Sequence, residues 1–512
     1  MEKKTAAVSM RNITKTFGPV RANDNVDLDI YKGEILALLG ENGSGKTTLM
    51  NMLSGIYYPD SGSIFINGEE VTIASPREAF EYGIGMIHQH FKLVDVMSAA
   101  ENIVLGLKEE GRLDLNAASR RITEICDAYG FEVDPNKKIY DMSVSQKQTV
   151  EIIKVLYRGA DILILDEPTA VLTPQETDKL FRILRAMRND GKAIVIITHK
   201  MHEVEELSDR VAVLRAGKYV GDMKTKDTNA QEMTSMMVGR SVTLNIDRPE
   251  PVDPQERIVV NGLTVRSADG ILKLDDVSFT ARSGEILGIA GISGSGQKEL
   301  LEAIAGLQPV ERGSISYVDE RGSSTELVGK DPLEISKLGV SLSFVPEDRL
   351  GMGLLGSMDI PTNMMLRTYR TGHRPFTDRK VPRDVAEKVV NDLEVSTPGL
   401  ATPVRRLSGG NVQKVLVGRE ISSAPTVLLT AYAVRGLDIN SSYTIYHLLN
   451  EQKMKGVAVI YVGEDLDVLL ELCDTIVVLC GGKVSGIVPG REAQKNEIGM
   501  MMTKIGGSNH ES

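Results

Sequence analysis

The sequence predicts two consecutive α/β domains, each built on a mostly parallel core sheet, and two observations carry this prediction. A glycine-rich loop occurs twice, at 40–48 and 291–298, and each copy follows a short apolar run, at 34–39 and 285–290. Further apolar runs at 161–165 and 193–197 return in the second half at 426–429 and 457–461. Buried strands that alternate with helical stretches are typical of parallel sheets covered by helices.

The repeat also sets the expected domain boundaries. Mostly helical stretches separate each glycine loop from the later strands, at 100–158 in the first half and 377–420 in the second. Between the halves, charged residues and prolines crowd together without an apolar period, which indicates a linker. We therefore expect a first domain at 1–242, a linker at 243–256, a second domain at 257–505 and a disordered tail at 506–512.

Composition excludes several classes of function. The chain has 59 basic and 70 acidic residues and a formal net charge of −11, so it lacks the basic character that nucleic-acid binding requires. Cys126, Cys473 and Cys480 have no metal-ligand spacing and are expected to be reduced thiols. The first residues lack the apolar segment of a signal peptide. No apolar run reaches the roughly 18 residues that a membrane-spanning helix needs, so we expect no transmembrane segment.

The first glycine loop carries the strongest chemical signal. It reads Gly40-Glu41-Asn42-Gly43-Ser44-Gly45-Lys46-Thr47-Thr48 and matches the phosphate-binding pattern G-x-x-x-x-G-K-[ST]. Such a loop turns backbone N–H groups onto phosphates, while its lysine reaches the β- and γ-phosphates and its hydroxyl holds Mg²⁺. We therefore expect this segment to bind ATP, with Thr47 as a ligand of Mg²⁺.

Polar residues follow two of the predicted buried strands. Asp166 and Glu167 come directly after the run 161–165, where Asp166 would hold Mg²⁺ and Glu167 would orient or deprotonate the attacking water. His199 follows the run 193–197 and could contact the γ-phosphate, and Gln89 could line the metal and water site. The alternatives are an acidic turn at a strand end, an ordinary structural histidine and a surface glutamine.

The second glycine loop has lost part of this chemistry. Its glycines remain at 291, 294 and 296, but Gln297 stands at the lysine position and Lys298 at the hydroxyl position. The second copy therefore keeps the backbone cradle without the lysine and the metal ligand.

Taken together, these motifs resemble the ATP-binding subunits of ABC transporters over nearly the whole chain, and in particular the fused double-cassette kind that serves sugar and nucleoside importers. The resemblance implies an antiparallel β subdomain and a helical subdomain beside each core sheet. It implies a signature motif, which is Leu407-Ser408-Gly409-Gly410-Asn411 in the second half and the degraded Met142-Ser143-Val144-Ser145-Gln146 in the first. It also places Phe17 where an aromatic side chain stacks on adenine, whereas the second half has Val265-Arg266 there.

A constant spacing aligns the two halves. Ser143 and Ser408, Asp166 and Ala431, His199 and Glu464, and Asp209 and Asp474 are each 265 positions apart. By this alignment, the second half has other residues at the positions of the Mg²⁺ aspartate, the catalytic base and the histidine. We expect a degenerate site that does not hydrolyse ATP, consisting of Gln297, Lys298, Glu347, Ala431, Tyr432 and Glu464.

In the family that this chain resembles, two cassettes pack head to tail, so that each ATP lies between one phosphate loop and the opposite signature. The resemblance therefore assigns Ser408, Gly409, Gly410, Asn411 and Asp438 to the intact ATP site, together with the first phosphate loop and Phe17. It implies Glu167, His199 and Gln89 as catalytic residues, and Thr47, Asp166 and Gln89 as the metal site. Thr173 is the counterpart of Asp438 and would serve the degenerate site.

The function implied is ATP hydrolysis that drives import of a nucleoside or simple sugar through two separate integral-membrane permease subunits. An extracytoplasmic solute-binding protein would be an indirect partner, and the chain would lie at the cytoplasmic face of the cell membrane. The segments 91–101 and 349–363 would receive the permease, and 88–94 resembles the nucleoside type. The alternative is a soluble double-cassette ATPase acting on ribosomes, but such proteins carry a long charged linker and two intact sites.

Overall fold

The chain divides into two compact units, Met1–Thr243 and Leu244–Ser512. The computed structural model describes residues 6–18, 20–88, 91–107, 114–169, 172–198, 200–239, 246–267, 269–292, 294–338, 340, 342–369, 378–435, 437–463 and 465–503. Each unit is described by itself below.

The first unit contains two sheets and eight α-helices in its described part. Its strands are β1 (Ala6–Phe17), β2 (Val20–Tyr31), β3 (Glu34–Leu39), β4 (Ser61–Ile66), β5 (Glu69–Val71), β6 (Ile84–Ile87), β7 (Ile162–Asp166), β8 (Ala193–Ile197), β9 (Arg210–Arg215) and β10 (Lys218–Lys224). Its helices are α1 (Lys46–Leu53), α2 (Pro76–Glu81), α3 (Ala99–Val104), α4 (Leu115–Tyr129), α5 (Val144–Tyr157), α6 (Pro174–Asn189), α7 (Met201–Leu207) and α8 (Ala230–Val238).

The second unit repeats this order of elements. Its strands are β11 (Glu256–Arg266), β12 (Leu272–Arg282), β13 (Ile286–Gly291), β14 (Arg312–Val318), β15 (Ser324–Glu326), β16 (Leu342–Val345), β17 (Val427–Ala431), β18 (Ala458–Val462), β19 (Thr475–Cys480) and β20 (Lys483–Pro489). Its helices are α9 (Gln297–Ile304), α10 (Pro332–Lys337), α11 (Ile360–Thr368), α12 (Lys380–Asp392), α13 (Gly409–Ser422), α14 (Ile439–Met454), α15 (Leu466–Leu472) and α16 (Lys495–Thr503).

The core sheets of the two units have the same topology. The order is β10-β9-β3-β8-β7-β6 in the first unit, and the second runs β20-β19-β13-β18-β17-β16 when read in the same direction. All pairings are parallel except those of the edge strands β10 and β20. Each unit also has a four-stranded antiparallel sheet, β2-β1-β4-β5 or β12-β11-β14-β15.

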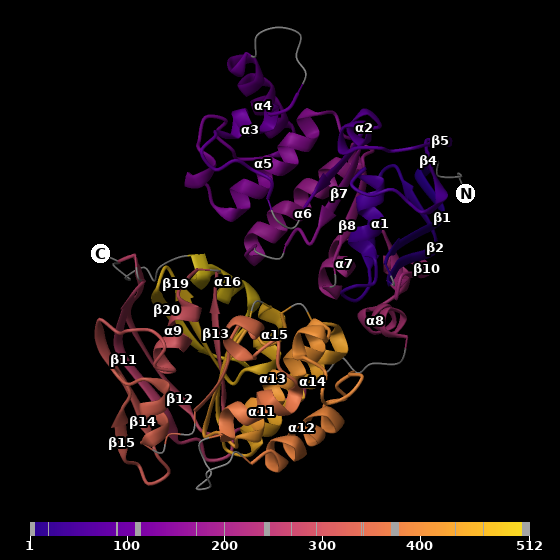
Figure 1. Ribbon diagram of the computed structural model, residues 1–512. Coiled ribbons are helices and arrows are strands. Elements are labelled where there is room, and N and C mark those ends of the chain that lie inside the picture. The colour runs from indigo at the N-terminus through magenta and orange to yellow at the C-terminus, as the bar shows by residue number, and fades with distance from the viewer. Residues whose placement is uncertain are drawn as a thin grey trace, which may run out of the picture. The chain divides into compact units, whose positions relative to one another are not determined.

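Each core sheet is buried on both faces, which explains its nearly continuous apolar runs. In β3, Leu36 and Leu38 pack toward the antiparallel sheet, whereas Ile35 joins the apolar cluster of helices α3 to α6. The helices α3, α4 and α5 lie together on one side of the first unit, and β1, β2, β4 and β5 lie on the other (Figure 1). This arrangement confirms the expected α/β class with antiparallel and helical subdomains.

Part of the segment expected to be a linker is bound to the second unit. Ile246 is buried in its helical core. Asn450 Nδ2 donates to the Asp247 carbonyl at 2.6 Å, and Arg248 donates to the Cys473 carbonyl at 2.6 Å. Residues 240–245 and the tail at 506–512 lie outside the described residues. Among the helices that the structure describes, none has the length and apolar character to cross a bilayer.

Candidate functional site

The first phosphate loop joins the buried strand β3 to helix α1. Gly45 caps the helix with a φ of 96°, in the left-handed region that favours glycine. A Cβ atom at Gly45 would lie 2.2 Å from the Ala22 carbonyl oxygen, and one at Gly40 would lie 2.3 Å from the Leu214 carbonyl oxygen. These two glycines are therefore required by close backbone contacts, and they hold the loop against the carboxyl edge of the sheet. Glu41 and Thr48 are partly buried, whereas Asn42 is exposed.

Lys46 is buried within this loop. Its Nζ donates to the carbonyl oxygens of Gly40 at 2.6 Å and of Glu41 at 2.9 Å. Burial lowers the pKa of Lys46, and the negative charges of Glu167, Asp166 and Glu41 partly offset that shift. The ammonium group is therefore positioned by the loop's own carbonyl oxygens and is poorly hydrated, which suits it to attract phosphate oxygens.

Thr47 and Asp166 come together although they are far apart in the sequence. Thr47 Oγ1 donates to Asp166 Oδ2 at 3.1 Å, because α1 begins beside the carboxyl end of β7. Burial raises the pKa of Asp166, and the nearby Glu167 carboxylate adds to the rise, while Thr47 and Lys46 oppose it. A hydroxyl and a carboxylate at hydrogen-bond distance form a hard-oxygen donor set, which fits Mg²⁺. Ser44 Oγ, buried in the same loop, has no hydrogen-bond partner among the residues that the structure describes.

Glu167 occupies a strained backbone position immediately after β7. Its φ is 47°, and its N–H donates to the Ile197 carbonyl of the neighbouring strand β8 at 2.9 Å. Tyr432 has a φ of 52° and makes the equivalent bond to the Val462 carbonyl at 2.9 Å. The two units therefore share the strained turn, and only the side chain presented there differs. Three residues expected at these sites, Gln89, His199 and Glu464, lie outside the described residues.

Phe17, the residue expected to stack on adenine, packs against a second aromatic ring. Its ring makes an edge contact with Tyr57 at a centroid distance of 5.2 Å, and both rings are exposed. In the second unit Arg266 ends the corresponding strand, and Gln308 Nε2 donates to its carbonyl at 2.9 Å. The aromatic pair thus occurs in one unit of the two. The sequence did not single out Tyr57, because no local pattern links it to Phe17, which lies 40 positions earlier in the chain.

The second phosphate loop keeps the backbone shape of the first. Gly296 caps α9 with a φ of 99°. The buried Gln297 Nε2 donates to the Ile292 carbonyl at 3.1 Å, so an uncharged amide takes the place of the lysine ammonium. Lys298 Nζ lies 3.8 Å from Glu302 Oε1 on its own helix.

A cavity of about 270 Å³ lies at this loop, and Lys298, Glu302, Glu347, Asp348 and Ala431 are among its lining residues. Glu347 forms an ion pair with Arg435, whose guanidinium lies 5.9 Å from the Tyr432 ring centroid. Ala431 ends β17 where Asp166 ends β7, so the second unit lacks a carboxylate at that point.

Both signature segments begin a helix with a serine cap. Ser143 Oγ accepts a bond from the Gln146 N–H at the start of α5, and Ser408 Oγ accepts one from the Asn411 N–H at the start of α13. The segments differ in the first helical turn, which has Gly409 and Gly410 only in the second unit. A Cβ atom at Gly410 would lie 3.3 Å from Ser441 Oγ, so the glycine lets α13 begin close to α14.

Asp438 has a local task in the second unit. Its carboxylate caps α14 and accepts bonds from the Ser441 N–H and hydroxyl, each at 2.8 Å. Thr173 caps α6 in the same way in the first unit. A contact between Asp438 and ATP stays a prediction.

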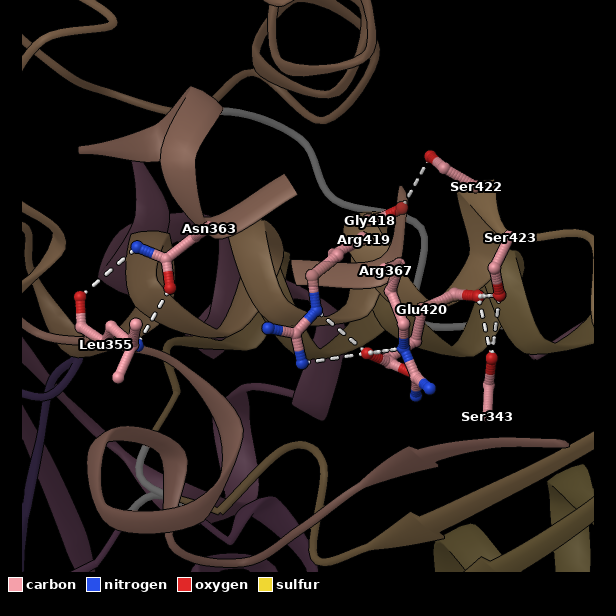
Figure 2. A network of polar contacts seen from close by, with 9 residues as sticks. All are labelled: Ser343, Leu355, Asn363, Arg367, Gly418, Arg419, Glu420, Ser422 and Ser423. Atoms are coloured by element: carbon pink, nitrogen blue, oxygen red, sulfur yellow. Dashed lines mark hydrogen bonds and ion pairs between the residues drawn. The ribbon is translucent and has the colours of Figure 1, made fainter. Parts of the chain in front are cut away.

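The far end of the signature helix is fixed by a charge cluster around the buried Glu420 (Figure 2). Arg367 Nε on α11 donates to Glu420 at 3.1 Å, and Arg419 Nε donates to it at 2.8 Å. Ser343 Oγ on β16 donates to the Glu420 carbonyl at 3.0 Å. Helix α13 is thereby tied both to the helical subdomain and to the core sheet.

Comparison with known proteins agrees with this geometry. The sequence pattern of the ABC transporter family matches residues 23–170 and 274–430. The guanosine import ATP-binding protein NupO of Bacillus subtilis is 40% identical over 502 residues, covering 97% of this chain and 97% of its own. The nucleoside import ATP-binding protein NupA of Lactococcus lactis is 40% identical, covering 98% of this chain and 99% of its own. The glucose import ATP-binding protein TsgD13 of Haloferax volcanii is also 40% identical, with 96% and 95% covered.

The two units share one topology, and each has a glycine-rich phosphate loop and a serine-capped signature helix, while the first also has an acidic strand end. These features define a double-cassette ATPase. The chain belongs to the ABC transporter family, among ATP-binding proteins of the nucleoside and sugar import type.

Proposed function

We propose that the chain hydrolyses ATP at the first unit's phosphate loop and that this drives import of a nucleoside or simple sugar through a separate membrane permease. The observation that carries the proposal is the grouping of Lys46, Thr47, Asp166 and Glu167 around one loop. The second unit has the same fold with Gln297, Lys298, Ala431 and Tyr432 at those positions, so we infer that its site is silent.

Each residue of the first unit has a distinct task in this proposal. Lys46 binds the β- and γ-phosphates, and Phe17 with Tyr57 offers a face to adenine. Glu167 accepts a proton from the attacking water, and His199 and Gln89 contact the γ-phosphate and the water. Thr47 Oγ1 and Asp166 would hold Mg²⁺, which, when bound, neutralises charge that develops on the phosphate oxygens.

The distribution of intact motifs supports a shared ATP site. The glycine-rich signature Ser408-Gly409-Gly410 lies in the unit that lacks the catalytic residues, and the degraded one lies in the unit that has them. We propose that the N–H groups at the start of α13 contact the γ-phosphate of the ATP bound by Lys46. Two units that lost motifs independently would not divide them in this way.

Exposed apolar side chains support a membrane partner. Within 349–363, Leu350, Met352, Leu355 and Met358 are all exposed, and Val96 is exposed within 91–101. Exposed apolar side chains that lie near one another in a segment can mark a contact surface. We propose that these segments receive the permease and hold the chain at the cytoplasmic face of the membrane. The named relatives are all import proteins, which favours this role over action on ribosomes.

The solute is a nucleoside or a simple sugar in this proposal, because the relatives named above are ATP-binding proteins of guanosine, nucleoside and glucose import. The chain is expected to contact the permease and not the solute. Measuring which solute stimulates ATP hydrolysis in the complex with permease and solute-binding protein would identify it.

The direct test of the site is Glu167→Gln. Loss of one well-placed base costs about 10²- to 10⁴-fold in rate, so steady-state turnover should fall by that factor while ATP still binds. Nucleotide retention and phosphate release are measured on the same preparation. Turnover close to that of the wild type would exclude Glu167 as the base.

A further inference from the structure

A buried carboxylate lies beside the segments that follow β7 and β8 in the first unit. Glu203, on α7, is 2% exposed. It accepts a hydrogen bond from Thr198 Oγ1 at 3.1 Å and a short one from Thr169 Oγ1. Lys200 Nζ lies 3.2 Å from Glu203 and 3.5 Å from Thr169 Oγ1. We call these four residues the Glu203 clasp.

The clasp joins the two segments that carry the proposed chemistry. Thr169 is two residues after Glu167, in the turn that follows β7. Thr198 and Lys200 are the residues immediately before and after His199, at the end of the adjacent strand β8. One carboxylate therefore links the backbone beside the proposed base to the backbone on both sides of the proposed histidine.

The second unit shows that the fold does not need this clasp. At the aligned positions it has Val434, Gly463, Asp465 and Val468, in place of Thr169, Thr198, Lys200 and Glu203. Val434 and Val468 pack against the apolar core there. The sheet order and the strained turn after the acidic strand are nevertheless the same.

This comparison separates a structural role from a functional one. A buried carboxylate contributes little net stability relative to apolar residues of similar size, because its desolvation opposes its polar contacts. The second unit, which lacks the catalytic side chains, has the apolar Val434 and Val468 at these positions. The first unit, which has the catalytic side chains, keeps the charged Glu203. This difference between the units is explained if ATP hydrolysis requires the segments after β7 and β8 to be held in fixed positions.

We propose that Glu203 is a positioning residue for ATP hydrolysis, which holds the segments after β7 and β8 in register so that Glu167 is presented to the attacking water. The inference rests on the catalytic site proposed above for the first unit. It adds a residue that acts through the backbone of others and does not itself contact ATP.

The test replaces Glu203 by the residue of the second unit, Glu203→Val, in the full-length chain. A displacement of catalytic groups by about 1 Å costs about 10²-fold in rate, so kcat should fall by that order. The KM for ATP should stay within about twofold, because Lys46 and the loop are untouched. The separate variant Glu203→Gln, which keeps hydrogen bonds with the hydroxyls of Thr169 and Thr198, should retain most of the wild-type kcat.

Two further variants make the result decisive. Glu34→Gln removes a buried carboxylate at the opposite end of the sheet, level with Ile162 of β7, and should leave kcat unchanged. The graft Thr169→Val, Thr198→Gly, Glu203→Val copies the second unit's packing and should fold while staying as slow as Glu203→Val. If Glu203→Val alone fails to fold, the proposal is tested by comparing kcat of the graft with kcat of Glu203→Gln.

The outcomes distinguish the two proposals. A folded Glu203→Val chain or graft with kcat within about twofold of the wild type would overturn the positioning role. Loss of kcat in Glu34→Gln equal to that in Glu203→Val would reduce the clasp to general stability. If Glu167→Gln retains turnover, the catalytic site itself is wrong, whatever the clasp variants do.

Discussion

Adding one methyl group to the equivalent glycine of each phosphate loop should separate the two sites. Gly45→Ala places a Cβ atom 2.2 Å from the Ala22 carbonyl oxygen and 2.7 Å from Asn23 Nδ2. Gly296→Ala places it 2.5 Å from Leu274 Cδ2 and 2.6 Å from the Lys273 carbonyl oxygen. The φ values of 96° and 99° are also nearly identical, so the two substitutions perturb their own loops alike.

The magnitude follows from these distances. Nonbonded atoms approach to about 3.5 Å, so each loop must shift by roughly 1 Å. The left-handed backbone adds about 1–2 kcal/mol of strain, which lowers the melting temperature of a domain of this size by roughly 2–8 °C. A shift of 1 Å in groups that hold a reacting phosphate costs about 10²-fold in rate.

We therefore expect similar thermal destabilisation in both variants, with turnover reduced about 100-fold in Gly45→Ala and by less than about threefold in Gly296→Ala. Calorimetry on the full-length chain gives the melting temperatures, and steady-state phosphate release gives kcat and KM. Equal loss of turnover in the two folded variants would refute the inference that only the first loop hydrolyses ATP.

Three further predictions concern the signature, the adenine site and the metal carboxylate. Ser408→Arg and Ser143→Arg each remove a helix cap worth about 1 kcal/mol, but only Ser408→Arg should cut turnover strongly, and equal loss would argue against sharing of the ATP site. Phe17→Ala should raise the KM for ATP about tenfold through lost stacking, with kcat nearly unchanged, and an unaltered KM would exclude Phe17 from the adenine site. Burial raises the pKa of Asp166 in the folded state. Above that raised pKa, the ionised carboxylate therefore lowers the free energy of unfolding. This destabilisation disappears as the pH falls toward the unfolded-state pKa of about 3.9. Asp166→Asn should accordingly melt at a higher temperature than the wild type at pH 8, by a margin that narrows toward pH 4, and should lose turnover; a constant margin would contradict the sign of the shift.

The sequence alone predicted the features that depend on local pattern. The continuous apolar run before Gly40 required a strand buried on both faces, and the loop residues from Gly40 to Thr48 fixed a strand, turn and helix in order. The constant spacing between Asp166 and Ala431 aligned the halves and showed which side chains the second half lacks. Periodicity and spacing suffice there because neighbouring residues determine the outcome.

The tertiary structure decided what depends on contacts between distant segments. No local pattern reveals that Tyr57 packs on Phe17 or that Arg367 reaches Glu420. Glu203 reads in the sequence as one more acidic residue of a short helix, and it gains meaning because parallel strands β7 and β8 end side by side. Hydrogen bonds of this kind depend on the order of strands in the sheet, which only the folded chain sets.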